Sequence, residues 1–322
     1  MSAFERFSVY PCRFGDILLR DLTSVSFRTA SKKSSVIPGG DLSPRAIVNC
    51  CSDPVIDLST KDLDSLFAGG AAVSMTYGYP VNTFNPPETA PTLLQFQRRV
   101  DGAAFAAGGA NSHVVASGGK GFLYVTEITA QQDDEEGVKV ALSYIVMSDD
   151  GLNPPFVFST GSILTSTPNF DGIWYLGPVR IGVIGGSLTT MTGIQSVTIR
   201  SGIDFRAPRA DGDIYPINGS INAINPEIRI TSLDMTANSL LTSPWGKALT
   251  VNANLSVNIF FQKGVHGGGR VAQATPVHML IVANAADQTM DSVTVQKLDD
   301  ARTEIIIRPI GPLVTSPKIA IT

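Results

Sequence analysis

Glycine-rich segments beside a histidine are the first places where this sequence could do chemistry. The run from His266 to Gly269 could offer backbone amides to an oxyanion, as a serine hydrolase of the esterase type requires. Such an enzyme also needs a nucleophilic serine on a strand–turn–helix elbow, usually Gly-x-Ser-x-Gly, and the sequence has no such pentapeptide. We therefore interpret this run as a flexible hairpin tip. A hydrolase that uses His266 with a remote serine or aspartate is kept as an alternative.

A phosphate-binding loop is the second candidate. Ser117 to Gly121 reads Ser-Gly-Gly-Lys-Gly, but Val114 stands where the motif needs its first glycine. No helix follows the lysine, and a phosphate loop also needs the amides of a helix N-terminus. This segment is predicted to be a turn that leads into a strand at Phe122.

Metal ligands have no favourable local spacing. Asp149–Asp150 and Asp211–Asp213 sit beside glycines, but neither stretch supplies the further oxygen ligands of a calcium loop, so both are interpreted as turns. The histidines are scattered at positions 113, 266 and 278, and we expect His278 to be a packed or surface residue within a strand. We predict no metal and no cofactor.

Acidic residues gather at Asp133 to Glu136. A run of this kind is usually the solvated tip of a hairpin. Its functional alternative is a repulsive surface that prevents a polyanion such as DNA from adhering.

The composition limits the class of protein that could carry these residues. In 322 residues, Lys, Arg, Asp and Glu make up 16%, against roughly 25% in typical soluble domains. The net charge is −4, which provides no basic field for neutralising phosphates. With 30 Gly, 20 Pro and 43% hydrophobic residues, the composition favours short strands and many turns over helical bundles or coiled coils.

Cysteine usage and hydropathy bear on location. Cys12, Cys50 and Cys51 form neither a disulfide framework nor a zinc motif, which favours synthesis in a reducing compartment such as a bacterial cytoplasm. The first residues contain Glu5 and Arg6 instead of the apolar stretch of a signal peptide. The most apolar long stretch, 181–199, is too polar for a transmembrane helix. We therefore expect a soluble protein.

Alternation of apolar and polar residues predicts strands along most of the chain. The clearest case runs from Thr250 to Phe261, and the acidic tip joins strands 121–129 and 138–148 into a hairpin. The same pattern predicts the strands 194–200, 227–233, 277–283 and 303–308. The expected fold class is mainly β, an antiparallel β-sandwich or barrel with one or two short helices.

The sequence predicts few helices and one domain boundary. Ser59 to Phe67 carries helix-capping and stop signals, and a second short helix could occupy 236–249. Loops are predicted at 80–91, 103–111 and 204–219. The Pro-rich stretch before residue 91 predicts an N-terminal arm or additional β-rich lobe over 1–90 and a sandwich core over 91–322. The sequence shows no repeat of fixed period.

Two stretches carry a resemblance to a known family. The first is the strand pair with its acidic tip. The second combines a strand, an acidic turn with Tyr-Pro, and a strand that reads Pro-Glu-Ile-Arg-Ile-Thr-Ser-Leu-Asp. The residues concerned are 120–130, 138–153, 193–205, 210–216 and 224–234. Their order and pattern resemble the major tail tube proteins of long-tailed bacteriophages and prophages, over about 92–310.

The resemblance implies a structural virion protein. Its protomers would form rings, with six members expected, that stack into a tube in the virion tail, contact other tail proteins and let DNA pass without specific binding. Strands 121–129, 138–148, 194–200 and 227–233 would build the sandwich, and loop 204–219 would contact neighbouring subunits or rings. The flanking helix would be 59–67 or 236–243. At 322 residues the chain is longer than a usual single-sandwich tube protein.

Charged residues on the tip and the loop are the candidates for lumen or inter-subunit contacts. They are Asp133, Asp134, Glu135, Glu136, Asp204, Arg206, Arg209, Asp211 and Asp213. No catalytic residue is predicted, and the chain is expected not to be an enzyme. The alternatives are another β-rich virion component, such as a capsid or decoration protein, a tail terminator or a receptor-binding protein, and, less favoured, a β-rich hydrolase.

Overall fold

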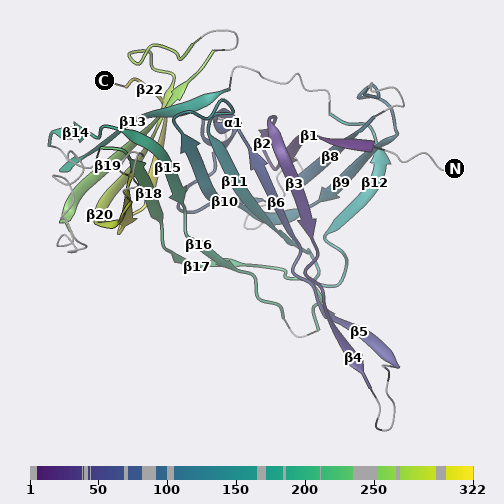
Figure 1. Ribbon diagram of the computed structural model, residues 1–322. Coiled ribbons are helices and arrows are strands. Elements are labelled where there is room, and N and C mark those ends of the chain that lie inside the picture. Colours follow the sequence, from purple (N-terminus) through teal and green to yellow (C-terminus); the bar gives the residue numbers. More distant parts are fainter. Residues whose placement is uncertain are drawn as a thin grey trace.

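The computed structural model shows a mainly β, antiparallel protein with one short helix in the residues it describes (Figure 1). Those residues are 6–37, 39, 43, 45–68, 72–81, 92–99, 105–164, 172–183, 186–210, 212–234, 252–265, 269–294 and 302–321. The elements fall into two consecutive groups, which we name the N-terminal unit (Arg6–Gly161) and the C-terminal unit (Trp174–Ile319).

The described residues of the N-terminal unit form twelve strands and the helix. They are β1 (Arg6–Phe14), β2 (Ile17–Leu19), β3 (Leu22–Arg28), β4 (Lys32–Val36), β5 (Ala46–Cys51), β6 (Val55–Thr60), α1 (Leu63–Phe67), β7 (Tyr79–Val81), β8 (Thr92–Arg99), β9 (His113–Gly118), β10 (Lys120–Gln131), β11 (Lys139–Met147) and β12 (Phe156–Gly161). One layer has the order β12-β9-β8-β1-β2, and the other contains β10-β11-β6-β3. β4 and β5 form a separate hairpin that projects from the body (Figure 1).

Ten strands are found in the described part of the C-terminal unit. They are β13 (Trp174–Val183), β14 (Leu188–Thr190), β15 (Ile194–Arg200), β16 (Ile203–Arg206), β17 (Ser220–Ile224), β18 (Glu227–Ser232), β19 (Asn252–Lys263), β20 (His278–Thr294), β21 (Arg302–Pro309) and β22 (Leu313–Ile319). β20 is long enough to take part in both layers, because its first half pairs with β19 and β22 and its second half with β21. This strand therefore links the two layers into one continuous hydrogen-bonded path.

The predicted strands are confirmed, because alternation is a local property that packing preserves. Segment 194–200 coincides with β15, and 227–233 and 303–308 correspond to β18 and β21. In β19, Val257, Ile259 and Phe261 are fully buried, as the alternation requires. Phe260 on the opposite face is also buried, since it packs with Leu280 and Ile321 in a second cluster.

The predicted helix at Ser59–Phe67 is too long. Ser59 and Thr60 end β6, where they pair with both β3 and β11, and the helix begins only at Leu63. Asp62 caps it by accepting a hydrogen bond from the Ser65 amide at 3.0 Å. Pairing within the sheet therefore overrides the capping signal at residues 59–60. The second candidate helix, 236–249, lies outside the described residues.

The described strands of the two units have the same topology, except that β9 and β10 together correspond to β20 and that β7 has no equivalent. The layer β12-β9-β8-β1-β2 corresponds to β22-β20-β19-β13-β14, and β10-β11-β6-β3 corresponds to β20-β21-β18-β15. The hairpins β4–β5 and β16–β17 occupy equivalent positions between these strands. The sequence shows no repeat of fixed period, but the structure shows that the chain is a tandem duplication of one topology.

The registers of the strand pairs make the equivalence residue-specific. Arg28↔Val55 in β3–β6 corresponds to Arg200↔Glu227 in β15–β18, a displacement of 172 residues (200 minus 28, 227 minus 55). The same displacement relates the irregularity after Leu22 to the one after Ile194. β10 and the second half of β20 are related by a displacement of 165 residues, so that Val125 corresponds to Met290. The register is irregular directly after each of these two residues.

The two units share a hydrophobic core. One cluster of buried side chains contains Phe14 and Tyr144 of the N-terminal unit together with Val179, Phe261 and Ile305 of the C-terminal unit. The units meet where β10 pairs with β15. We name this contact the internal junction.

Strands on either side of residue 90 also belong together. β1 pairs with β8, and β6 pairs with β11, so residues 1–90 contribute to the same layers as later residues. The predicted boundary itself falls in 82–91, outside the described residues. The visible division is the one between the two units, between residues 161 and 174.

Candidate assembly surfaces

The acidic tip is the turn between β10 and β11, as predicted. Asp133 and Glu135 are exposed, whereas Asp134 and Glu136 have basic partners. Lys139 Nζ lies 2.7 Å from Glu136 and 3.3 Å from Asp134, and Lys61 Nζ is 3.7 Å from Glu136. The tip therefore carries a partly compensated charge.

Those contacts shift the ionisation of the tip. The Glu136 amide donates to Asp134 at 2.8 Å, and this hydrogen bond is the main reason that the pKa of Asp134 lies below its ordinary value. The pKa of Glu136 is lowered mainly by the hydrogen bond from Lys139, whose own pKa is raised by the two carboxylates. Both acids stay ionised around neutral pH.

The second group of candidates lies at the other end of the β10–β11 hairpin. Asp204 and Arg206 belong to β16, so the predicted loop 204–219 begins later than expected. Asp204 accepts from Asn222 at 2.7 Å and lies 3.6 Å from the Arg206 guanidinium. β10 has 12 residues, which places the two groups roughly 35–40 Å apart. The structure therefore does not bring them into one site.

Arg209 and Asp213 are tied to their own chain. Arg209 pairs with Asp53, which follows the β4–β5 hairpin, although its Nε is buried without a partner in the part of the chain that the structure describes. Asp213 accepts from the Ala210 amide at 3.1 Å and closes a local turn. Asp211 lies outside the described residues.

Backbone hydrogen bonds hold the loop after β16 in place. The Ser52 amide donates to the Ile214 carbonyl at 2.8 Å, and the Ile214 and Tyr215 amides donate to Gly151 at 2.8 and 2.9 Å. The Ser148 amide donates to Pro216 at 2.8 Å. These bonds fasten the second hairpin to the N-terminal unit of the same chain.

Aromatic packing adds to that attachment. Phe205 of β16 stacks on Phe122 of β10, with ring centroids 4.1 Å apart and an interplanar angle of 9°. Ile203 and Met147 are buried in the same cluster. The hairpin β16–β17 is therefore packed on the adjacent unit.

The equivalent hairpin, β4–β5, has a different environment. It extends away from the body in Figure 1, and Ile47 and Val48 are 65% and 54% exposed. Ile37, just after β4, is 54% exposed. This hairpin lies within the predicted N-terminal arm or lobe, 1–90, and its second strand, Ala46–Cys51, was not among the predicted strands although it is mostly apolar. An apolar surface on a projecting hairpin is typical of a contact with another molecule.

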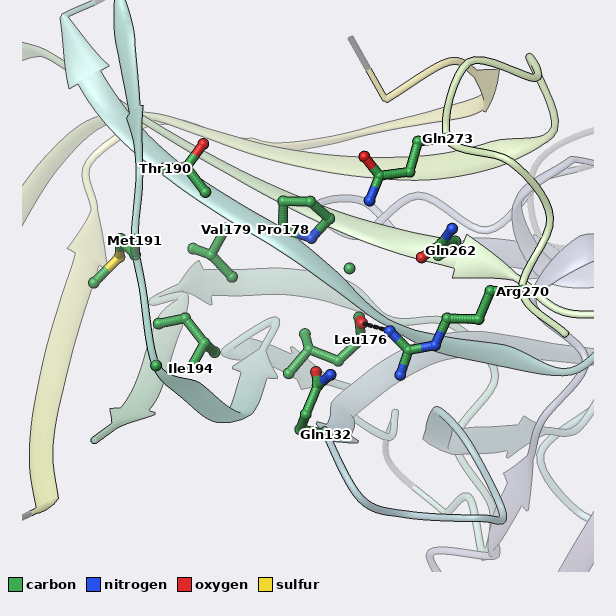
Figure 2. Close-up of a pocket in the computed structure, with 12 residues that line it drawn as sticks. Gln132, Leu176, Pro178, Val179, Thr190, Met191, Ile194, Gln262, Arg270 and Gln273 are labelled. Carbon is green, nitrogen blue, oxygen red and sulfur yellow. Dashed lines mark hydrogen bonds between the residues drawn. The ribbon is translucent and has the colours of Figure 1, made fainter. Parts of the chain in front are cut away.

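A cavity of about 420 Å³ lies where the acidic tip of the N-terminal unit meets the C-terminal unit (Figure 2). Gln132, Leu176, Ile194 and Gln262 are among its lining residues. Arg270 also lines it, and its guanidinium donates to the Leu176 carbonyl at 3.3 Å. The lining is thus mainly apolar groups and amides.

The histidines serve the fold in the described part of the chain. His113 is fully buried, accepts from the Arg98 amide at 3.1 Å and contacts the Ala107 carbonyl at 2.7 Å. His278 repeats this arrangement with Lys263 at 3.1 Å and Ala272 at 2.9 Å. Each histidine thus stabilises the corner between β8 and β9 or between β19 and β20. His266, on which the hydrolase alternative depends, lies outside the described residues.

The described residues contain neither a cluster of metal-ligating side chains nor a helix able to span a membrane. No group of three or more His, Cys, Asp or Glu side chains is arranged to hold a metal ion in that part of the chain. None of its helices has the length and apolarity needed to cross a membrane.

Comparison with known proteins gives no family. No protein-family model matches this chain, and a search of curated protein sequences also found no match. The function must therefore be argued from the surfaces described above.

Proposed function

We propose that this chain is a structural virion protein that assembles into stacked rings and so forms a tail tube through which DNA passes. The supporting observation is that two equivalent sandwich units use their equivalent surfaces differently. The C-terminal hairpin β16–β17 packs on a neighbouring unit, whereas the N-terminal hairpin β4–β5 presents Ile47 and Val48 to solvent. When one copy of a repeated unit has its hairpin packed on a neighbouring unit and the other copy has it exposed, the exposed hairpin can make the same contact with another molecule, and this favours self-assembly.

The charge distribution is compatible with a conduit for DNA. The net charge is −4, and the acidic tip keeps Asp133 and Glu135 exposed. Carboxylates repel phosphates, and a lumen poor in lysine and arginine would let DNA slide without binding. In this proposal the protein is made in the cytoplasm of a bacterial host, becomes part of the virion tail and contacts other tail proteins.

Electron microscopy of the purified protein tests this proposal. We expect rings or short tubes at raised protein concentration, with a central hole wide enough for a DNA duplex, and antibodies against the protein should label the tail shaft of the parent particle. Monodisperse monomers at all concentrations, together with labelling of the capsid or of no part of the particle, would contradict the tail tube assignment.

A further inference from the structure

The internal junction shows how one sandwich unit binds the next. β10 of the N-terminal unit and β15 of the C-terminal unit pair in antiparallel register, with Glu127 opposite Arg200 and Thr129 opposite Thr198. Arg200 Nε lies 2.7 Å from the Glu127 carboxylate, and the Gln132 amide donates to the Gln195 carbonyl at 2.7 Å. Ser201 adds a hydroxyl bond to the Val125 carbonyl.

Each strand of this junction has an equivalent that is not paired in the same way. β3 is equivalent to β15 and lies at the end of its sheet path, so one edge of it has no partner strand among the described residues. The second half of β20 is equivalent to β10 and is paired with β21 on one side. No strand is assigned to its other side within the described residues.

We propose that the edge of β3 in one copy of the chain pairs with the second half of β20 in the next copy, repeating the internal junction between molecules. The register of this contact follows from that of β10 and β15: subtracting 172 from a β15 residue gives its β3 equivalent, and adding 165 to a β10 residue gives its β20 equivalent. Arg28 then lies opposite Ser292, and Ser26 opposite Thr294. Open strand edges are hazards in monomers, and strand addition by an equivalent chain removes the hazard.

The contact is head-to-tail, because each copy offers β3 at one end and β20 at the other. A repeated head-to-tail contact forms a closed ring or an open filament, and the proposed function requires the ring. This step rests on the proposed function: a six-membered tube ring made of sandwich units closes with three chains, since each chain supplies two units.

The hairpins support the same contact. At the internal junction Phe205 stacks on Phe122. The equivalent positions hold Lys33 in the β4–β5 hairpin and Asp287 in β20, which are oppositely charged. The β4–β5 hairpin of one copy therefore lies over β20 of its neighbour, as β16–β17 lies over β10 at the internal junction.

A disulfide between Ser26→Cys and Thr294→Cys tests the pairing and counts the chains. Cys50 and Cys51, which are exposed and half-buried, are first replaced by serine, and Cys12 remains because it is buried. Oxidation of the assembled protein should give a non-reducing gel ladder of one, two and three chains, with the three-chain form dominant at completion. The matched control is Thr129→Cys with Thr198→Cys, which should cross-link within one chain and stay at monomer size.

The outcomes separate this inference from the proposed function. Rings in the microscope without covalent oligomers, while the control pair is oxidised, would overturn the β3–β20 interface and leave the tail tube proposal in place. A ladder that continues to six chains would overturn the three-chain ring. Absence of rings and of covalent oligomers would overturn both.

Discussion

Equivalent residues in the two units show how backbone strain is distributed. Gly202, just after β15, has a φ of +64°, and a Cβ there would lie 1.8 Å from the Asn225 carbonyl oxygen. The equivalent residue after β3 is Ala30, which has a φ of +44°. A left-handed conformation is unfavourable for alanine by about 1–2 kcal/mol, so the N-terminal unit carries strain that the C-terminal unit avoids.

Exchanging these residue types should have opposite effects. Ala30→Gly is expected to raise the free energy of unfolding by about 0.5–1 kcal/mol, because it relieves the positive φ. Gly202→Ala is expected to lower it by about 3 kcal/mol, because the new methyl group meets backbone. Urea unfolding of the two single variants checks both signs. A loss of stability in both variants would mean that the two turns are not equivalent.

Asp150 organises the turn that anchors the second hairpin. Its carboxylate accepts from the Leu152 and Asn153 amides at 3.0 and 2.9 Å and from the Ser148 hydroxyl at 3.1 Å. The amide of Asn153 is the largest cause that lowers the pKa of Asp150, from 3.8 to about 2. Because the folded-state pKa is the lower one, this stabilisation is present above about pH 4 and is lost as the pH falls towards 2.

An acid titration should therefore distinguish Asp150→Asn from the unchanged protein. We expect the variant to be less stable at pH 6, with a difference in melting temperature that shrinks between pH 4 and pH 2. NMR titration of the Asp150 carboxyl carbon should give a midpoint near 2, as its hydrogen bonds require. A midpoint near the ordinary aspartate value would show that the turn does not hold the carboxylate in solution.

At the scale of elements, the two hairpins illustrate how one topology acquires two roles. β16–β17 is fixed by the Phe205–Phe122 stack and by backbone bonds from the following loop, while β4–β5 has exposed apolar residues instead. The register of both hairpins is the same, so the difference comes from what lies beside them. β16–β17 packs on the N-terminal unit that precedes it in the chain, whereas in our proposal the partner of β4–β5 comes from another copy.

Removing one aromatic ring should expose this difference. Phe205→Ala is expected to lower the free energy of unfolding of the monomer by about 2 kcal/mol, because a half-buried ring and its stacking partner are lost. The matched variant at the equivalent position, Lys33→Ala, should change monomer stability by less than about 0.5 kcal/mol, since Lys33 is exposed. Urea unfolding at low protein concentration measures both. Equal losses would contradict the assignment of different environments.

At the scale of the whole molecule, the two units form one packed body. A single cluster of buried side chains crosses both, and the β10–β15 ladder joins their sheets. Separating the units would expose apolar side chains and break a continuous sheet. The duplicated halves are therefore expected to unfold together, although each has a complete set of strands.

Calorimetry of the monomer checks this cooperativity. We expect one thermal transition, with equal calorimetric and van't Hoff enthalpies. Two resolved transitions, each with about half of the total enthalpy, would mean that the units are independent domains connected by a linker.

The sequence predicts more of the fold than of the assembly. Strand alternation identifies β15, β18 and β21, and the acidic run marks the turn between β10 and β11. The partners of Glu136 could not be predicted, because Lys61 comes from the end of a distant strand. The duplication had one local signal: Phe-Gln-Arg at 96–98 and Phe-Gln-Lys at 261–263, each followed by a histidine fifteen residues after its basic residue.

Composition and alternation by themselves determined that this protein is built from antiparallel strands, because those properties depend on neighbours in the chain. Only the tertiary structure decided that the strands form two equivalent units, and that β10 and β15 pair while the equivalent edges of β3 and β20 have no partner strand among the described residues. The physical reason is that strand pairing conserves register and hydrogen bonding but tolerates different side chains. Phe122 and Asp287 occupy equivalent positions without any similarity in sequence.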